Sequence, residues 1–464
     1  MHLVNLSIVF LLLNAWSGLD YWSSAAITIW LWYVIRLFEQ SNKRIAFKEF
    51  ILVLYGLNYL FSPALSYLLN KSSFYRMKLP EDEYFMLAIP CILLLQVGMN
   101  TVKTNVFKFD FSTVSHQSSL NRDILVSWIY AGLALRLFYF IVPDELAFFL
   151  YLVSGVRFAA AYGLYVLDAR RYKWHIISIL AVEIAMSLKD GMFHDTVMWL
   201  IFFGIFWVYV TKPSRNLKLL LGLGLCLAVY ILQVTKAEYR SQIGKGEEAG
   251  LSAFQDAVSE NVNAKEGLFD AEKTTNSLTR VNQAWILASA ANRMNRFQDF
   301  QGLTLVGRYA EAAFLPRFLA KDKLMAGDKQ IFNRFSGHFI NNGTSMGLGV
   351  LADGYVAYGH MGAYGFTFVL GLIFAMIFRT VEKWSRISPF FILFMFPILN
   401  YAVRPDCETQ VIMGHIVKGL FVFGCLSMYY ASYFSKKQQQ AKLEQEKRTN
   451  HVTRLRKISV RRAT

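Results

Sequence analysis

The chain has 464 residues, of which 55% are hydrophobic and only 17% are charged. A soluble domain usually carries about 25% charged residues, and here the deficit lies in long apolar runs separated by short charged clusters. In lipid, each backbone polar group must be bonded within its own segment, so these runs are expected to be helices. The alternating pattern of membrane β-strands is not seen. Composition therefore excludes a soluble globular domain and predicts an all-α polytopic membrane protein.

We expect about twelve transmembrane helices. In chain order they cover 3–17, 20–38, 49–69, 84–102, 123–143, 146–167, 174–189, 193–211, 217–235, 361–379, 387–403 and 409–434. Residues 3–38 also allow a single span followed by a re-entrant hairpin. No basic segment precedes the first apolar run and no small-residue cleavage signal follows it. We therefore interpret this run as a retained span and not as a signal peptide.

Lysine and arginine accumulate in every second loop of this arrangement. The loops contain Lys43, Arg44 and Lys48; Lys103, Lys108 and Arg122; Arg170, Arg171 and Lys173; Lys212, Arg215 and Lys218; and Arg379, Lys383 and Arg386. The positive-inside rule places them, and both termini, on the cytoplasmic side. We expect the membrane to be a bacterial inner membrane. The tail 435–464 supplies +8 of the formal net charge of +16. Because the other cations lie mostly in short loops, we expect contact with anionic membrane lipids and no nucleic-acid partner.

Four regions follow from this pattern. They are an N-terminal membrane bundle of about nine spans (1–235), a large periplasmic loop (236–359), the C-terminal membrane helices (360–434) and a basic cytoplasmic tail (435–464). The large loop is too long for a simple connector. Helical spacing predicts helices over Thr279–Phe300 and Leu305–Leu315, the second stopped by Pro316. The stretch Gly244–Asn276 is polar and its pattern is weaker.

Several cations lie close to spans on the predicted outer face, where topology disfavours them. The main ones are Lys189, Lys236, Arg240, Arg280, Arg317 and Arg404. Lys236 and Arg240 are one helical turn apart at a membrane exit, and Arg404 precedes Pro405 in a very short turn. A phosphate group on this face would explain them, because arginine binds phosphate bidentately and keeps its charge. Snorkelling at the interface is the alternative for Lys189, Lys236 and Arg240.

A second cluster on the same face is polar and rich in glycine. It runs from Asn333 through His338 and Thr344-Ser345 to Asp353, Tyr355 and Gly362. Its glycines permit tight turns and close backbone approach, as a re-entrant loop or a ligand cradle requires. It matches neither a Walker loop nor a dinucleotide fingerprint.

Candidate acid and base groups on this face are Asp353, Asp406, Glu408, His338, His360 and Glu311. Neither His338 nor His360 has a second histidine at ligand spacing. We therefore interpret each as a structural histidine and not as a metal ligand. The four cysteines form no CxxC pair. We predict no metal site, no disulfide framework and no cofactor.

The layout resembles the Wzy-type O-antigen and exopolysaccharide repeat-unit polymerases, within the wider group of multi-span lipid-linked glycosyltransferases. The resemblance covers the topology and a set of short local patterns. These are Lys189-Asp-Gly191, Lys236 with Tyr239-Arg240, Arg280, Phe314-Leu-Pro316-Arg317 with Lys321 and Lys323, Asn333 with Phe335, and Thr344-Ser345 before Asp353-Gly-Tyr355. Lys189 stands where arginine is more usual in such proteins.

The resemblance implies a metal-independent glycosyltransferase of lipopolysaccharide or exopolysaccharide synthesis. It would transfer a growing glycan from undecaprenyl diphosphate to another undecaprenyl-diphosphate-linked oligosaccharide, with chain-length regulator and flippase proteins as candidate partners. Charge building on the leaving diphosphate would be stabilised by catalytic Arg240, Arg317 and Arg404. The acceptor hydroxyl would meet a base at Asp353 or Glu408, with His338 as the alternative. The expected substrate-binding residues are Lys189, Lys236, Arg280, Asn333, His338 and Tyr355.

Three other functions fit parts of the pattern. An O-antigen ligase uses the same chemistry. A lipid-linked-oligosaccharide flippase or other transporter should show repeats, broken helices and polar groups at mid-membrane, whereas polar residues here gather on one predicted face. A structural membrane scaffold gives no reason for arginines on the outer side.

Overall fold

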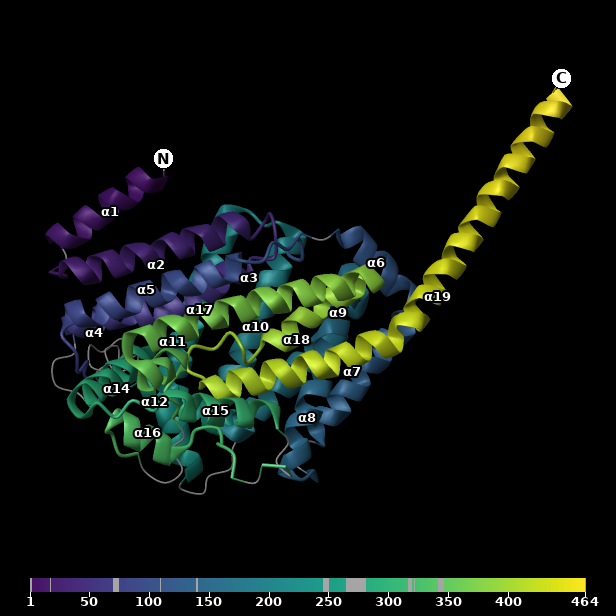
Figure 1. Ribbon diagram of the computed structural model, residues 1–464. Coiled ribbons are helices and arrows are strands. Elements are labelled where there is room, and N and C mark those ends of the chain that lie inside the picture. Colours follow the sequence, from purple (N-terminus) through teal and green to yellow (C-terminus); the bar gives the residue numbers. More distant parts are fainter. Residues whose placement is uncertain are drawn as a thin grey trace. The chain divides into compact units, whose positions relative to one another are not determined.

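A computed structural model of the chain describes residues 2–16, 18–69, 75–108, 110–138, 141–244, 250–263, 281–315, 319–320, 322–340 and 346–463. The described residues form helices and turns, with no strand among them, as the apolar runs predict. Figure 1 shows these helices coloured along the chain.

Seven described helices or helix runs are long and apolar enough to cross a membrane. They are Phe47–Leu69, Glu81–Asn100, Leu146–Asp190, His194–Thr211, Arg215–Lys236, Val350–Ile387 and Thr409–Lys437. The predicted spans 146–167 and 174–189 fall in one run, which contains a backbone break at Asp168. Two others are shorter apolar helices, Leu6–Ala15 and Pro389–Leu399. The coarse prediction of an all-helical membrane protein is confirmed, and the count of about twelve spans stays a prediction.

The chain folds into two compact units, each assembled from separate stretches. Unit 1 contains Met1–Lys108, Leu180–Arg379 and Ile398–Val417, and unit 2 contains Phe109–Ile179, Thr380–Pro397 and Lys418–Thr464. In unit 1, α2 (Tyr21–Gln40) packs against α1 (His2–Trp16), α3 (Phe47–Gly56) and α5 (Glu81–Asn100). A π-helical turn, η1 (Leu57–Phe61), joins α3 to α4 (Ser62–Leu69).

Hydrogen bonds join several basic loops of unit 1 to one another. Asn42 Nδ2 donates to the Pro213 carbonyl over 3.3 Å, and Lys218 Nζ donates to the Phe38 carbonyl over 2.8 Å. Arg379 Nη1 donates to the Lys103 carbonyl over 3.2 Å. The first bond links the loop after α2 to the turn between α10 (His194–Thr211) and α11 (Arg215–Gly244), and the second links α2 to the first turn of α11. The third links the loop after α5 to α17 (Val350–Ile387).

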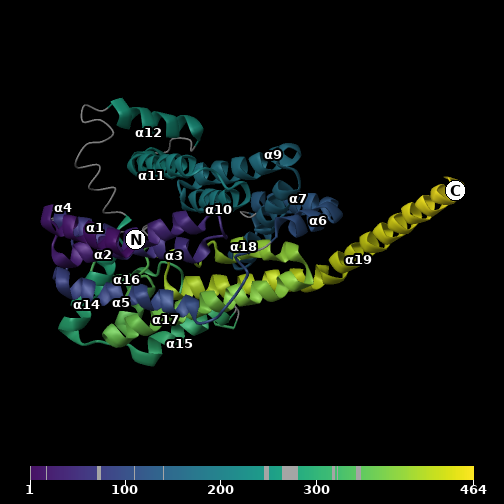
Figure 2. The same cartoon turned by 90° about the horizontal axis from the view of Figure 1, so that it is seen from above.

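Unit 1 also contains the helices of the segment 236–359. These are α12 (Leu251–Asn263), α14 (Ala284–Phe297), α15 (Gly302–Phe314) and α16 (Lys329–Ser336). Helices α14 and α15 confirm the two amphipathic helices predicted there. Helix α12 was not expected in the polar stretch Gly244–Asn276, and it packs on the end of α11, as Figure 2 shows. Its Phe254 meets Tyr239 with ring centroids 5.5 Å apart, so an aromatic contact joins α12 to α11.

Glycines shape α17 as the sequence suggests. The backbone leaves helical geometry at Tyr358 and Gly359, where Gly359 has a φ of +61°. Across this kink, Gly354 and Gly362 approach so closely that a Cβ on Gly362 would lie 2.0 Å from the Gly354 carbonyl oxygen. The prediction of tight turns and close backbone approach is therefore confirmed, although residues 350–358 are helical and not a loop.

Unit 2 is built around aromatic side chains. It contains α6 (Phe111–Leu120), α7 (Arg122–Leu137), α8 (Asp144–Ser154), the first part of α9 (Val156–Asp190) and the short helix η3 (Pro389–Phe394). Phe390 stacks on Phe434 of α19 (Thr409–Ala463) with ring centroids 5.8 Å apart. The ring centroid of Trp128 lies 5.7 Å from that of Phe390. Gly163 of α9 leaves room for the Phe390 ring, because a Cβ there would come within 2.7 Å of it. The predicted tail 435–464 continues α19 to Ala463.

Candidate functional site

The turn 400–408 connects α18 (Met395–Leu399) to α19 and carries the candidate Arg404. The Arg404 guanidinium is buried and ion-paired with Asp195 at the start of α10. Its Nε also donates to the Asn400 carbonyl over 3.3 Å, and the guanidinium carbon lies 3.8 Å from the centre of the Tyr401 ring. The carboxylate of Asp195 therefore balances the charge of Arg404. This ion pair explains an arginine at this position without a bound phosphate.

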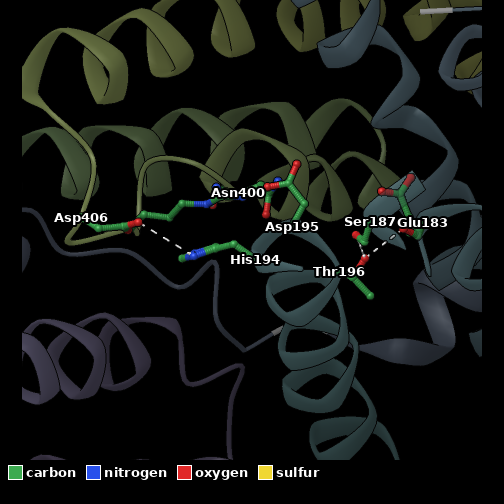
Figure 3. Close-up of polar contacts among 8 residues, drawn as sticks. Glu183, Ser187, His194, Asp195, Thr196, Asn400 and Asp406 are labelled. Carbon is green, nitrogen blue, oxygen red and sulfur yellow. Dashed lines mark hydrogen bonds and ion pairs between the residues drawn. The ribbon is translucent and has the colours of Figure 1, made fainter. Parts of the chain in front are cut away.

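His194 brings a second pair to the same place. Its Nδ1 lies 3.9 Å from a carboxylate oxygen of Asp406, and Figure 3 shows the two side chains facing each other. His194 also lies within electrostatic range of Lys236 on α11. We call His194, Asp195, Lys236, Arg404 and Asp406 the charged cluster.

The corner between α9 and α10 holds the two residues His194 and Asp195 in position. Thr196 Oγ1 donates to the Glu183 carbonyl over 3.1 Å and lies 2.6 Å from Ser187 Oγ, as the second group in Figure 3 shows. Gly191 makes the turn possible with a φ of +60°, in the left-handed region that glycine adopts without strain.

Arg240 and its neighbour Tyr239 fasten the end of α11 to this corner. Arg240 Nε donates to the Gly191 carbonyl over 3.0 Å, and the Tyr239 hydroxyl donates to the Leu188 carbonyl over 2.7 Å. Arg240 and Lys189 are both exposed. Because Lys236 lies one helical turn before Arg240, the structure brings three predicted cations to the same corner as the charged cluster.

Asp353 lies in a buried position on α17. Its Oδ1 accepts a hydrogen bond from the Tyr309 hydroxyl at 2.7 Å, and its Oδ2 accepts one from the Thr409 backbone N–H at 2.8 Å. Each carboxylate oxygen is therefore bonded, and the residue joins α15, α17 and the start of α19.

Glu408 ends the turn 400–408 and is also buried. Its Oε2 accepts from the Gly327 backbone N–H at 3.0 Å and from Gln410 Nε2 at 2.7 Å. Burial, and secondarily the nearby charge of Asp353, raises the pKa of Glu408 to about 8. Such a group changes its protonation state close to neutral pH, as an acid or base catalyst requires.

Tyr59 connects η1 to the turn 400–408. Its hydroxyl donates to the Pro405 carbonyl over 3.1 Å and both groups are buried. The same side chain lies within electrostatic range of Asp353 and Asp406. Gly349, with a φ of +83°, leaves room for this hydroxyl, because a Cβ there would approach it to 2.7 Å.

An apolar pocket of about 280 Å³ adjoins Asp353. Its walls come from α15, α17 and α19 and include Val306, Ala313, Val369, Ile373 and Met413. Tyr309 and Thr409, the two residues that bond Asp353, also line it. The pocket thus has apolar walls and reaches residues that contact a buried carboxylate.

Residues 82–386 match the family described as Domain of unknown function (DUF8712). The chain belongs to this family. The match covers 305 of the 464 residues and contains Asp195, Lys236 and Asp353, whereas the turn 400–408 follows it. No curated protein and no solved structure matches the chain significantly.

Other predicted site residues of this DUF8712 chain lie against α14 and α16. His338 Nε2 is 3.1 Å from Ser289 Oγ and its ring meets Trp285 edge-on, 5.1 Å between centroids. Burial lowers the pKa of His338 to about 4, with a further contribution from Lys78, so this imidazole is neutral at pH 7. This geometry agrees with a structural histidine and disfavours His338 as a base that titrates near neutral pH.

Asn333 and Tyr355 also have local partners in the DUF8712 region. Asn333 Oδ1 accepts from the Ile340 backbone N–H at 3.3 Å, and the buried Tyr355 hydroxyl donates to Asn295 Oδ1 over 2.7 Å. Arg280 and Arg317, predicted to contact diphosphate, lie outside the described residues. Among the residues that are described, no three His, Cys, Asp or Glu side chains gather as metal ligands would.

Three contributors to the site of this DUF8712 chain were not chosen from the sequence. They are His194 and Asp195, at the start of the predicted span 193–211, and Tyr309, within the predicted helix Leu305–Leu315. Their partners Asp406, Arg404 and Asp353 lie 212, 209 and 44 positions away. The only local signal was a His-Asp pair at a span start, where charged residues are common.

Proposed function

We propose that the chain is a glycosyltransferase that joins undecaprenyl-diphosphate-linked oligosaccharide repeat units at the outer face of a bacterial inner membrane. The observation that carries the proposal is the apolar pocket lined by Tyr309 and Thr409, which bond the buried Asp353. Thr409 directly follows the turn with Arg404 and Glu408. A pocket with apolar walls beside polar and charged groups suits an amphiphile with a long apolar chain and a charged head.

The charged cluster provides electrostatic stabilisation for such a reaction. When the bond between the sugar C1 and the diphosphate oxygen breaks, negative charge builds on the leaving diphosphate, and fixed cations stabilise it. In this proposal Lys236 and Arg240 contribute positive charge, and Arg404 exchanges its bond with Asp195 for one with the diphosphate. An arginine suits this exchange because its charge does not titrate away.

Glu408 is the better candidate for the base, and Asp353 supports it. The acceptor hydroxyl forms the new bond to C1 and gives its proton to Glu408, whose pKa of about 8 makes transfer in both directions easy near neutral pH. The buried charge of Asp353 helps to keep that pKa high. Asp353 itself is held by Tyr309 and Thr409, which favours a positioning role.

The proposal includes the topology of about twelve spans with both termini in the cytoplasm. The hydrogen bonds Asn42–Pro213, Lys218–Phe38 and Arg379–Lys103 support it, because each involves a loop predicted to be cytoplasmic. The segment 236–359 would then lie on the periplasmic side with the charged cluster.

The test uses a strain deleted for this protein and complemented with variants, with surface glycan separated by size on a gel. Val369→Trp adds a bulky ring to the wall of the apolar pocket, and Glu408→Gln removes the base. Met376→Trp is the matched control, because Val369 and Met376 are exposed to similar extents on α17 and Met376 does not line the pocket. Membrane levels of each variant are measured in parallel.

Under the proposal, deletion, Val369→Trp and Glu408→Gln leave only single repeat units, while Met376→Trp restores the long ladder. Loss of all surface glycan with long lipid-linked chains accumulating would favour a ligase. Repeat units retained on the cytoplasmic side would favour a flippase. An unchanged ladder in the deletion strain would contradict all three.

A further inference from the structure

A second, polar cavity lies elsewhere in unit 1, between the ends of α2 and α5 and the start of α3. Its volume is about 60 Å³. It is lined by three cations, Arg36, Arg44 and Lys48, by the carboxylate of Glu49, and by neutral residues that include Trp32, Gln96 and Asn100. One water needs about 10–15 Å³ of such space, so the cavity has room for a group of several atoms.

The cations of this cavity outnumber its carboxylate by two. Glu49 is buried and forms an ion pair with Arg44. Lys48 Nζ donates to two neutral oxygens, the Met99 carbonyl at 2.7 Å and Asn100 Oδ1 at 3.1 Å. The Arg36 guanidinium carbon lies 5.4 Å from the centre of the Trp32 ring. The single carboxylate thus balances one of the three positive charges that line the cavity.

The cavity lies at the ends of two candidate membrane spans. Lys48 and Glu49 are in the first turn of Phe47–Leu69, and Asn100 is the last residue of Glu81–Asn100. Trp32 is of the residue type enriched at the level of lipid headgroups. A polar cavity at this height faces the zone where lipid phosphates lie, and two arginines and a lysine offer donors that match phosphate oxygens.

We propose that this cavity binds a negatively charged phosphate group, with Arg36, Arg44 and Lys48 as its donors. The headgroup of an anionic phospholipid and free inorganic phosphate share this chemistry. The site is separate from the charged cluster and the apolar pocket, and it does not depend on the proposed glycosyl transfer.

The full-length protein in detergent is titrated with phosphatidylglycerol, and bound lipid is counted by native mass spectrometry. Phosphatidylcholine is the comparison lipid, since its ammonium group cancels the phosphate charge. Arg36→Gln removes one donor, and Arg36→Lys keeps the charge. Lys43→Gln is the matched control, because Lys43 is an exposed cation of the adjoining loop that does not line the cavity.

We expect Arg36→Gln to weaken phosphatidylglycerol binding about tenfold, the effect of losing one charge-assisted hydrogen bond, while Arg36→Lys retains most of it and Lys43→Gln changes nothing. If Arg36→Gln does not fold, Asn100→Asp adds a negative charge at an exposed position of the cavity with almost no change in shape, and should weaken binding similarly.

Competition with inorganic phosphate distinguishes the two sources. Lipid binding that persists in about 10 mM phosphate, roughly ten times a dissociation constant of about 1 mM, assigns the cavity to a headgroup. Displacement assigns it to the free ion. Both results support a phosphate site. Equal binding of the two lipids, or equal losses in Arg36→Gln and Lys43→Gln, would overturn the proposal.

Discussion

Arg404 forms an ion pair with Asp195, which lies 209 positions earlier in the chain. The two side chains are 6% and 21% exposed, so loss of either partner leaves the other charge poorly solvated. Asp195→Asn and Arg404→Gln should each lower the stability by about 2–4 kcal/mol, somewhat less than for a fully buried pair. The double variant should lose less than the sum of the two, and thermal unfolding in detergent measures this double-mutant cycle. Purely additive losses would show that the pair contributes no coupling.

Glu408 predicts a dependence of stability on pH. Its pKa is raised in the folded protein from an ordinary 4.5 to about 8. Its contribution to stability is therefore fully present below pH 4.5 and is lost as the pH rises through 8, by at most about 1.4 kcal/mol per pH unit. Glu408→Gln should flatten the decline in unfolding temperature between these pH values. The exposed Glu311→Gln controls for the loss of one carboxylate, and an identical slope in both variants would contradict the assignment.

The contact between Gly354 and Gly362 predicts opposite effects of two alanine substitutions on one helix. Gly362→Ala would place a Cβ 2.0 Å from the backbone oxygen of Gly354, so the kinked segments must separate. We expect a loss of about 1–3 kcal/mol. Gly365→Ala meets no atom within 4 Å and should stabilise the helix by about 0.5–1 kcal/mol. Unfolding temperatures of the two variants check the prediction, and a stable Gly362→Ala protein would be inconsistent with the close approach.

Tyr309 is predicted to act through Asp353. Tyr309→Phe keeps the ring in the pocket wall but removes the donor to Asp353 Oδ1, and should cost about 1–3 kcal/mol because a buried acceptor loses its partner. Under the proposed function it should also shorten the glycan ladder. Tyr358→Phe, at a residue 48% exposed, is the control and should change neither property. If the two variants have the same stability and the same glycan ladder, the hydroxyl of Tyr309 contributes to neither property, and the prediction is wrong.

Apolar periodicity located many helices well. The predicted spans 84–102 and 193–211 correspond to Glu81–Asn100 and His194–Thr211. In both, charged residues at the ends of a continuous apolar run mark where the helix begins or ends. Helix α12 was not predicted. Its Phe254 packs on Tyr239 of a separate helix, and this contact lies outside a local window of sequence.

The candidate site was predicted in part. Among the predicted site residues, the structure places Lys236 and Arg404 near His194, and Asp353 near Glu408. Charge in a short turn or near a span end is visible in the sequence. Their partners were not visible, because the pairing of Arg404 with Asp195 depends on how distant helices pack.

The hydrogen bond from Tyr59 to Pro405 joins residues 346 positions apart. During synthesis, the helices that carry Tyr59 and Asp195 leave the ribosome long before the turn that completes their bonding. Until that turn arrives, Asp195 lacks the guanidinium of Arg404 and Asp353 lacks the Thr409 N–H. The charged cluster can therefore be completed only after Arg404 and Asp406 have been synthesised, and a chain that ends before residue 400 lacks the turn that completes it.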